Sequence, residues 1–243
     1  GKSPCIVTEK ADLEITAHRI IWGKLLNAGQ TCIAPDYILV DKKIKTELIK
    51  KLKKYILQDF GANPLLSEHY PRIISQEATE RLTSLINNES PNILFGGQTD
   101  IIQRYVAPTL IDEPAPDGKL MQEEIFGPIL PILGYDKIED AITFVNKKDK
   151  PLALYFFGNK QDAKQVMQST SSGGMCVNDT IMHIVNSHLP FGGVGKSGMG
   201  NYHGHASFLT FSHSRSVHTG SWVPDFKFRY APYKLPQIIK RFL

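Results

Sequence analysis

Short apolar runs alternate with longer segments of helical periodicity along most of the chain, and this alternation strongly limits the possible folds. An apolar run bounded by helical segments is typical of a strand that is buried on both faces. We expect strands at residues 5–8, 35–41, 92–95, 105–111, 129–134, 152–157 and 174–177. We expect helices at residues 17–28, 44–56, 78–86, 138–146 and 162–169. The pattern predicts an α/β fold in which helices cover a parallel sheet.

Residues that commonly begin or end helices stand at several of these boundaries. Asp12 precedes the first helical segment, Gly29 follows it, and Ser75 precedes the third. Asp and Ser side chains accept hydrogen bonds from the first N–H groups of a helix, and Gly adopts the backbone conformation that ends one. Residues 192–200 contain too many glycines for a regular element, so we expect a loop there.

The charge distribution excludes some classes of protein. The chain has 28 basic and 24 acidic residues, a net charge of only +4, and no basic cluster that alternates with aromatic residues. A nucleic-acid groove needs such a cluster, so no nucleic-acid partner is expected. The basic runs at residues 50–54 and 147–150 are expected to be solvated faces of a helix and a turn. The sequence also has no window of about 20 consecutive apolar residues, which argues against a membrane span.

The three cysteines, Cys5, Cys32 and Cys176, are too few and too widely spaced for a disulfide framework. Free thiols indicate a reducing compartment, so we expect a cytoplasmic location, with or without membrane association. The His and Cys residues also lack the spacing of metal ligands, and no metal site is predicted.

Cys32 lies between the end of the first helix and the buried strand at residues 35–41. Backbone N–H groups at such a junction can face a reacting oxygen, and a thiolate there could be activated. On local chemistry alone, the stronger interpretation is a small buried hydrophobic side chain, because Thr31 and Ile33 flank the cysteine. The wider motif context favours the nucleophile.

Four motifs in one order carry a resemblance to a known family. They are Gly-Lys-Ser-Pro at residues 1–4, Gly-Gln-Thr-Cys at 29–32, Glu-Glu-Ile-Phe-Gly-Pro at 123–128, and the glycine loop at 190–200. Together they resemble the aldehyde dehydrogenase superfamily. Residues 34–37, 202–204 and 210–213 narrow the resemblance to the class 3 branch, which includes fatty aldehyde dehydrogenases. The resemblance reaches to about Val217 and resumes at residues 229–233.

The resemblance implies NAD(P)-dependent oxidation of an aldehyde to a carboxylic acid. In this chemistry the Cys32 thiolate adds to the aldehyde, hydride leaves the thiohemiacetal for the nicotinamide, and water hydrolyses the thioester. NAD and NADP remain alternatives. The resemblance also assigns Glu124 to the ribose hydroxyls of the cofactor and Phe126 to the side of its ribose and nicotinamide. An acidic loop before a strand is the alternative interpretation of this segment.

The same resemblance implies an apolar entrance for the aldehyde. The residues expected to line it are Trp22, Leu26, Ile184, Val185 and Phe191. An apolar entrance favours medium or long aliphatic aldehydes, or aromatic ones. Trp22 and Leu26 also stand at helical spacing, so packing in the core is an equal alternative for them.

The resemblance covers only the C-terminal half of the family's pattern. The general-base glutamate, the oxyanion asparagine and the dinucleotide-binding domain belong to the family's N-terminal half, and residues 1–4 begin inside the motif that contains the base. We therefore expect either a partial sequence of a longer enzyme or a natural truncation, and the intact motifs favour the partial sequence.

We expect a catalytic domain at residues 1–207, an oligomerisation strand at 208–219 and a tail at 220–243. In relatives that strand joins the sheet of a second subunit, which implies a homodimer. Residues 235–243 are apolar and basic, and a gate over the substrate entrance, a weak membrane contact and a surface helix are alternatives for them. Two other functions stay open: a non-catalytic interaction protein, and a thiol esterase that needs no cofactor.

Overall fold

The computed structural model describes residues 1–232. The chain divides into two compact units, Gly1–Thr210 and Phe211–Leu243. The first unit contains the whole sheet, and the described part of the second has one short 3-10 turn, Lys227–Arg229. The predicted tail segment at residues 235–243 lies outside the described residues. Within residues 1–232, no helix has both the length and the apolar character that a membrane crossing requires.

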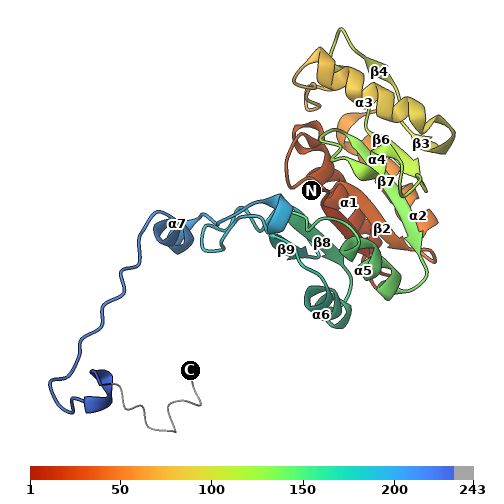
Figure 1. Cartoon of the computed structure of the whole chain (residues 1–243). Coiled ribbons are helices and arrows are strands. Elements are labelled where there is room, and N and C mark those ends of the chain that lie inside the picture. The colour runs from red at the N-terminus through yellow and green to blue at the C-terminus, as the bar shows by residue number, and fades with distance from the viewer. Residues whose placement is uncertain (233–243) are drawn as a thin grey trace. The chain divides into compact units, whose positions relative to one another are not determined.

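A seven-stranded sheet forms the centre of the first unit, in the order β3-β6-β7-β2-β1-β8-β9 (Figure 1). All neighbouring pairs are parallel except β3 with β6. The strands of this sheet are β1 (Pro4–Val7), β2 (Tyr37–Asp41), β3 (Ile93–Phe95), β6 (Thr109–Asp112), β7 (Ile129–Tyr135), β8 (Ala153–Phe157) and β9 (Gly174–Val177). The predicted α/β fold with a parallel sheet is confirmed.

Helices cover both faces of the sheet. The helices of the first unit are α1 (Leu13–Leu25), α2 (Lys45–Phe60), α3 (Gln76–Asn88), α4 (Lys119–Gln122), α5 (Ile138–Asn146), α6 (Lys160–Ser169) and α7 (Gly204–Thr210). Apolar side chains of α1, α2 and α3 join one buried cluster, and those of α5 and α6 join the other. Since each cluster also contains residues of the central strands, the two clusters are the two faces of one sheet.

Alternate residues of the central strands point into different clusters, as the pleat of a strand requires. On β8, Tyr155 belongs to the cluster below α1 and α2, whereas Leu154 and Phe156 belong to the cluster below α5 and α6. On β1, Cys5 and Ile6 divide in the same way. Tyr155 is the register partner of Cys5, so the two side chains lie on the same face at the centre of the sheet.

The single strand predicted at residues 105–111 is wrong, because the structure has two strands there. β5 (Tyr105–Val106) pairs antiparallel with β4 (Thr99–Asp100), and β6 joins the main sheet from Thr109 onward. Pro108 separates the two strands. A proline has no N–H to donate to a strand ladder, so the chain changes its pairing partner at this residue.

The strand predicted at residues 208–219 is not formed in this chain. Phe208 lies in α7, and from Phe211 to Thr219 the backbone makes no strand pairing with any other described residue. A strand needs a partner for its N–H and C=O groups, and a single copy of this chain does not provide one here. Whether a second copy does so is a separate prediction.

Candidate functional site

Cys32 is the exposed thiol of the three. It lies in a turn that follows the short 3-10 helix Leu26–Gly29, and the N–H of Ala34 donates to the carbonyl of Thr31 across that turn, with a distance of 3.0 Å. The other two thiols are buried, and burial raises the pKa of both Cys5 and Cys176. An accessible thiol ionises and reacts far more readily than a buried one, so the geometry separates Cys32 from the other two cysteines.

The backbone before Cys32 takes an unusual path. Asn27 and Ala28 have positive φ angles of 52° and 51°, and Gly29 has a φ of 74°. A side chain on Gly29 would overlap the carbonyl group of Gly127. Glycine is therefore required at position 29 both for its φ angle and for a direct backbone contact. This contact joins the cysteine loop to the loop that carries Glu124 and Phe126.

The side chain of Gln30 fixes the cysteine loop from a second side. Its Nε2 donates to the carbonyls of Asn27 and Arg72 at 3.0 and 3.2 Å, and its Oε1 accepts from the N–H of Ile74 at 2.8 Å. One amide group thus links the loop to itself and to residues 72–74. Three hydrogen bonds from one half-buried side chain hold the residues just before Cys32 in one conformation.

Three buried charged side chains, Lys2, Lys24 and Asp36, form an ionic group near the cysteine loop. The Nζ of Lys2 is 2.9 Å from a carboxylate oxygen of Asp36, both side chains are 5% exposed, and the Nζ of Lys24 is 3.8 Å from the other oxygen. Asp36 also accepts from the N–H of Ile125, at 3.2 Å. Burial lowers the pKa of Lys2, and it lowers the pKa of Lys24 to about 8, against the opposing attraction of Asp36.

This ionic group joins three distant segments of the chain. Lys2 donates to the carbonyls of Leu120 and Glu123 at 2.8 and 2.7 Å, in addition to its ion pair with Asp36. Charged groups that leave water need several partners to offset their desolvation. The segments at residues 1–3, 32–36 and 120–125 are therefore held as one unit around the thiol loop.

Glu124 and Phe126 both reach the surface, on either side of the fully buried Ile125. The segment is not extended throughout, because Phe126 has a φ of 50°. The carboxylate of Glu124 is 3.4 Å from the terminal amine of Gly1. The ring of Phe126 is 44% exposed. A carboxylate and an aromatic ring are therefore available on one short loop.

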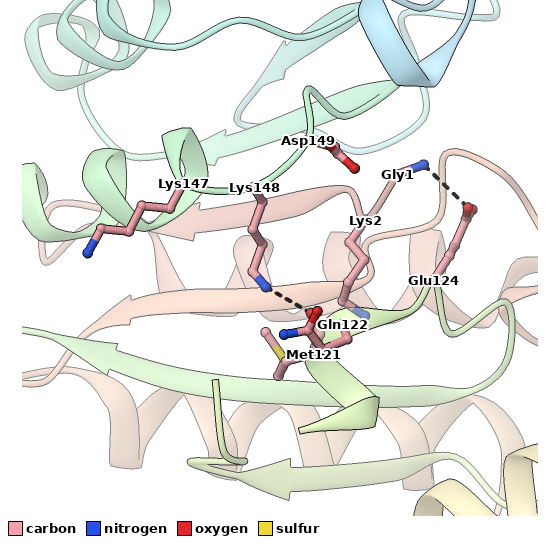
Figure 2. Close-up of a pocket in the computed structure, with 8 residues that line it drawn as sticks. All are labelled: Gly1, Lys2, Met121, Gln122, Glu124, Lys147, Lys148 and Asp149. Atoms are coloured by element: carbon pink, nitrogen blue, oxygen red, sulfur yellow. Dashed lines mark hydrogen bonds and ion pairs between the residues drawn. The ribbon is translucent and has the colours of Figure 1, made fainter. Parts of the chain in front are cut away.

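Glu124 lines a polar cavity of about 360 Å³ (Figure 2). The other lining residues are Gly1, Lys2, Met121, Gln122, Lys147, Lys148 and Asp149. Lys148 donates to the carbonyl of Met121 at 2.8 Å, so Lys148 as well as Lys2 is already engaged by other groups. The predicted solvated basic run at residues 147–150 thus has one member that contributes to packing.

Trp22 and Leu26 lie together on a second cavity, of about 470 Å³. Their side chains are 43% and 44% exposed, so neither is a core residue in this chain. Phe60 and Pro71 add further apolar surface, while Asp59, Glu68 and His69 also line the cavity. The cavity is apolar near the end of α1, next to the cysteine loop, and has ionisable groups elsewhere in its lining.

The other three predicted entrance residues differ from each other in exposure. Val185 is 64% exposed, Ile184 is half-buried against the core, and Phe191 is only 7% exposed. Phe191 packs against the rings of His183, Tyr202 and His203. It therefore supports the loop that follows β9 more directly than it offers a surface to a ligand.

Sequence patterns alone do not reveal the Lys2–Asp36 ion pair or the contact between Cys176 and His183, whose Sγ and Nδ1 lie 3.1 Å apart. One signal for the ion pair is present: Asp36 is the lone acid at the start of a buried apolar run. A lone charge in such a run needs a buried partner. Within residues 1–232, no group of three or more His, Cys, Asp and Glu side chains is arranged to hold a metal ion.

A model of the aldehyde dehydrogenase family matches residues 1–217. The chain is 48% identical over 238 residues to the 4,4'-diaponeurosporen-aldehyde dehydrogenase of Staphylococcus aureus, covering 95% of this chain and 52% of that protein. It is 46% identical to the dimeric NADP-preferring aldehyde dehydrogenase of Rattus norvegicus, covering 98% of this chain and 53% of that protein. Aldehyde dehydrogenase family 3 member A2 of the same rat species is 50% identical, with 88% and 44% covered.

Solved structures show the same similarity. Staphylococcus aureus AldH in its substrate-bound state has a TM-score of 0.88 and 45% identity, covering 100% of this chain and 53% of that one. An NADP-dependent glyceraldehyde-3-phosphate dehydrogenase from Bacillus halodurans, solved with NADP, has a TM-score of 0.80 and 28% identity, with 88% and 45% covered. The chain spans about half the length of the curated relatives that it matches.

Proposed function

Because this chain belongs to the aldehyde dehydrogenase family, we propose that it is the thiol-bearing part of an enzyme that oxidises aldehydes to carboxylic acids with NAD or NADP. The observation that supports this proposal best is the setting of Cys32. It is the exposed thiol of the chain, and the loop that carries it is held by Gln30, by the contact of Gly29 with Gly127 and by Asp36.

In the proposed reaction the Cys32 thiolate forms a bond to the aldehyde carbon, and the carbonyl electrons become an oxyanion. Within residues 1–232, the N–H groups of Cys32 and Ile33 make no hydrogen bond, so both are free to donate to that oxyanion. Bound NAD or NADP supplies the ring that accepts the hydride from the thiohemiacetal carbon. Water then breaks the C–S bond of the thioester, which releases the acid and the thiol. Following the family resemblance, we place the base that activates this water outside these 243 residues.

We assign Glu124 and Phe126 to the nicotinamide half of the cofactor. Their chemistry fits this group: an accessible carboxylate can accept from two ribose hydroxyls, and an exposed ring can pack beside a sugar and an aromatic ring. Gly29 against Gly127 fixes the distance between this loop and the thiol loop. The distance between the cofactor ring and Cys32 would then be set by a contact between two backbones rather than by flexible side chains.

For the substrate we propose medium or long aliphatic aldehydes, or aromatic ones. Trp22 and Leu26 supply an exposed apolar surface beside the cysteine loop, which supports this choice. Ile184 and Val185 would extend that surface, and Phe191 would support their loop from below. The Staphylococcus aureus relative is named for 4,4'-diaponeurosporen-aldehyde.

We also propose a homodimer, in which residues 208–219 add to the sheet of a second copy. The exposed side chains of Phe208 and Phe211 support it, and the Rattus norvegicus relative is named as dimeric. We propose that residues 1–207, which precede this strand, form the catalytic domain. Three free cysteines are consistent with a reducing compartment such as the cytoplasm.

The test uses the protein at the length of its relatives. Aldehyde-dependent formation of NADH or NADPH should fall to background in Cys32→Ser, because no nucleophile remains to form the thiohemiacetal. Cys5→Ser and Cys176→Ser are the matched controls and should keep activity if they fold. Full activity in Cys32→Ser would contradict the proposal.

A further inference from the structure

Tyr155 makes a buried hydrogen bond to the residue next to Cys32. Its phenol oxygen lies 2.5 Å from the carbonyl oxygen of Ile33, and the two side chains are 0% and 1% exposed. Burial raises the pKa of Tyr155, so its hydroxyl stays protonated and donates throughout the ordinary pH range. The bond joins the centre of the sheet to the thiol loop.

The surroundings of Tyr155 allow its ring little freedom. Cys5 is its register partner on β1, and the ring of His183 lies edge-on at a centroid distance of 6.1 Å. The Nδ1 of His183 in turn contacts the Sγ of Cys176, at 3.1 Å. Because the phenol has a fixed place on a central strand, it can hold the Ile33 carbonyl in a fixed direction.

The Ile33 carbonyl is anchored on the side of Cys32 that Gln30 does not reach. Gln30 holds the residues before the thiol, while Tyr155 holds the first peptide group after Ile33. Between these two anchors lie the N–H groups of Cys32 and Ile33, which are free to donate. Fixing both ends of so short a segment sets the direction in which these N–H groups point.

We propose that Tyr155 is a positioning residue for the reaction at Cys32: its hydrogen bond to the Ile33 carbonyl aims the free N–H groups at the oxyanion that forms when the thiol attacks a carbonyl carbon. This inference rests on the proposed function for the role of Cys32. Tyr155 acts through the backbone of the loop, by its hydrogen bond to the Ile33 carbonyl.

The experiment compares two reactions of Cys32 in the 243-residue chain. Acylation by p-nitrophenyl acetate passes through an oxyanion, whereas alkylation by iodoacetamide displaces iodide and forms none. Mass mapping gives the rate constant of each reaction at Cys32. Tyr155→Phe removes only the hydroxyl. Tyr135→Phe is the matched control, because Tyr135 also donates from a buried phenol to a strand carbonyl, that of Val7, at 2.9 Å.

The acylation rate constant of Tyr155→Phe should fall by roughly tenfold to a hundredfold, as expected for misdirected oxyanion donors, with alkylation little changed. Tyr135→Phe should leave the ratio of the two rates near that of the parent. An unchanged ratio in Tyr155→Phe, or an equal fall of both rates, would overturn the proposal. The assay needs neither aldehyde nor nicotinamide, so its outcome is separate from that of the turnover test.

A second variant covers the case in which Tyr155→Phe does not fold. It carries 2,3,5-trifluorotyrosine at position 155, which keeps the ring and ionises at lower pH. The ratio of acylation to alkylation should fall as the fluorinated phenol loses its proton, because a phenolate cannot donate to the Ile33 carbonyl. A ratio that stays flat while the absorbance of the phenolate appears would contradict the proposal.

Discussion

The backbone of Gly29 rests directly on the carbonyl group of Gly127, with no side chain between them. One glycine precedes the exposed thiol by three residues, and the other follows Phe126. The spacing between the nucleophile and the loop assigned to the cofactor is thus set by two backbones in contact. A contact of this kind cannot be widened without displacing one loop or the other.

The first prediction tests this contact by adding one methyl group. Gly29→Ala should lower the free energy of unfolding by roughly 3 kcal/mol or more, since it adds overlap with Gly127 to the strain of a positive φ angle. Gly200→Ala is the control, because Gly200 has a nearly equal φ of 73° with nothing within 4 Å of its Cβ position. It should cost only about 1–2 kcal/mol. Urea denaturation measures both, and equal losses would show that the contact carries no cost.

The second prediction concerns thiol reactivity. Cys32 should be alkylated by iodoacetamide long before Cys5 and Cys176, because it is exposed and the others are buried with raised pKa values. Peptide mapping of the folded chain at increasing times gives the order of labelling. Labelling of either buried cysteine first would contradict the assignment. In urea the three should label at similar rates, which shows that the fold creates the difference.

The third prediction is a pH dependence of stability. The pKa of Lys24 is lowered from 10.5 to about 8 by burial, so between about pH 8 and pH 10.5 the unfolded chain binds the proton and the folded chain does not. Lys24 should therefore contribute a rise of roughly 1–3 kcal/mol in the free energy of unfolding across this window. The raised pKa values of the buried Cys5, Cys176 and Tyr155 act in the opposite direction, so the contribution of Lys24 is measured as a difference between variants. Below the window both states are charged, and this contribution stops changing.

Lys24→Met should remove this contribution, which is measured as the free energy of unfolding in urea at a series of pH values. Some slope should remain, because burial also lowers the pKa of Lys2. Lys50→Met removes a cation from the exposed face of α2 and should leave the rise unchanged. If the difference in the free energy of unfolding between the parent and Lys24→Met stays constant across the window, Lys24 keeps its proton in the folded chain.

The fourth prediction concerns Glu124 in the protein at the length of its relatives. Glu124→Gln should slow hydride transfer and spare attack by the thiol, because charge-assisted hydrogen bonds of about 1.5–3 kcal/mol are lost to the cofactor ribose. A deuterated aldehyde should then give a larger isotope effect on turnover than in the parent enzyme. Glu123→Gln, at the exposed neighbouring acid, is the matched control. If both variants keep the parent isotope effect and rate, Glu124 is a surface acid.

Local patterns predicted most elements because each boundary has a local cause. The predicted ranges of α5 and β9 agree with Ile138–Asn146 and Gly174–Val177 in the structure, where the apolar periodicity is clear on both sides. The strand predicted at residues 208–219 is not formed within a single copy of the chain, and its pairing with a second copy stays a prediction. Its residues have strand-like composition, but a strand forms only when another strand lies beside it, and composition does not reveal the partner.

The features of the candidate site also fall into two groups: those that short motifs indicate, and those that depend on contacts between residues far apart in the sequence. Short motifs singled out Cys32 and Glu124, although the residues that flank Cys32 favoured a buried side chain and the structure exposes it. The pairing of Lys2 with Asp36 and the bond from Tyr155 to Ile33 join residues that are far apart, and no periodicity links them. Such contacts depend on strand order, which became known only with the structure.

β1 begins at the fourth residue of the chain and is enclosed by β2 on one side and β8 on the other. During synthesis its first neighbour follows within a few tens of residues, but residues 153–157 emerge much later. Until then a fully apolar strand carries an open ladder edge, and such an edge readily pairs with another nascent chain. The requirement for so distant a neighbour also raises the contact order and slows folding. The strand order thus leaves one edge of β1 unpaired until β8 is made.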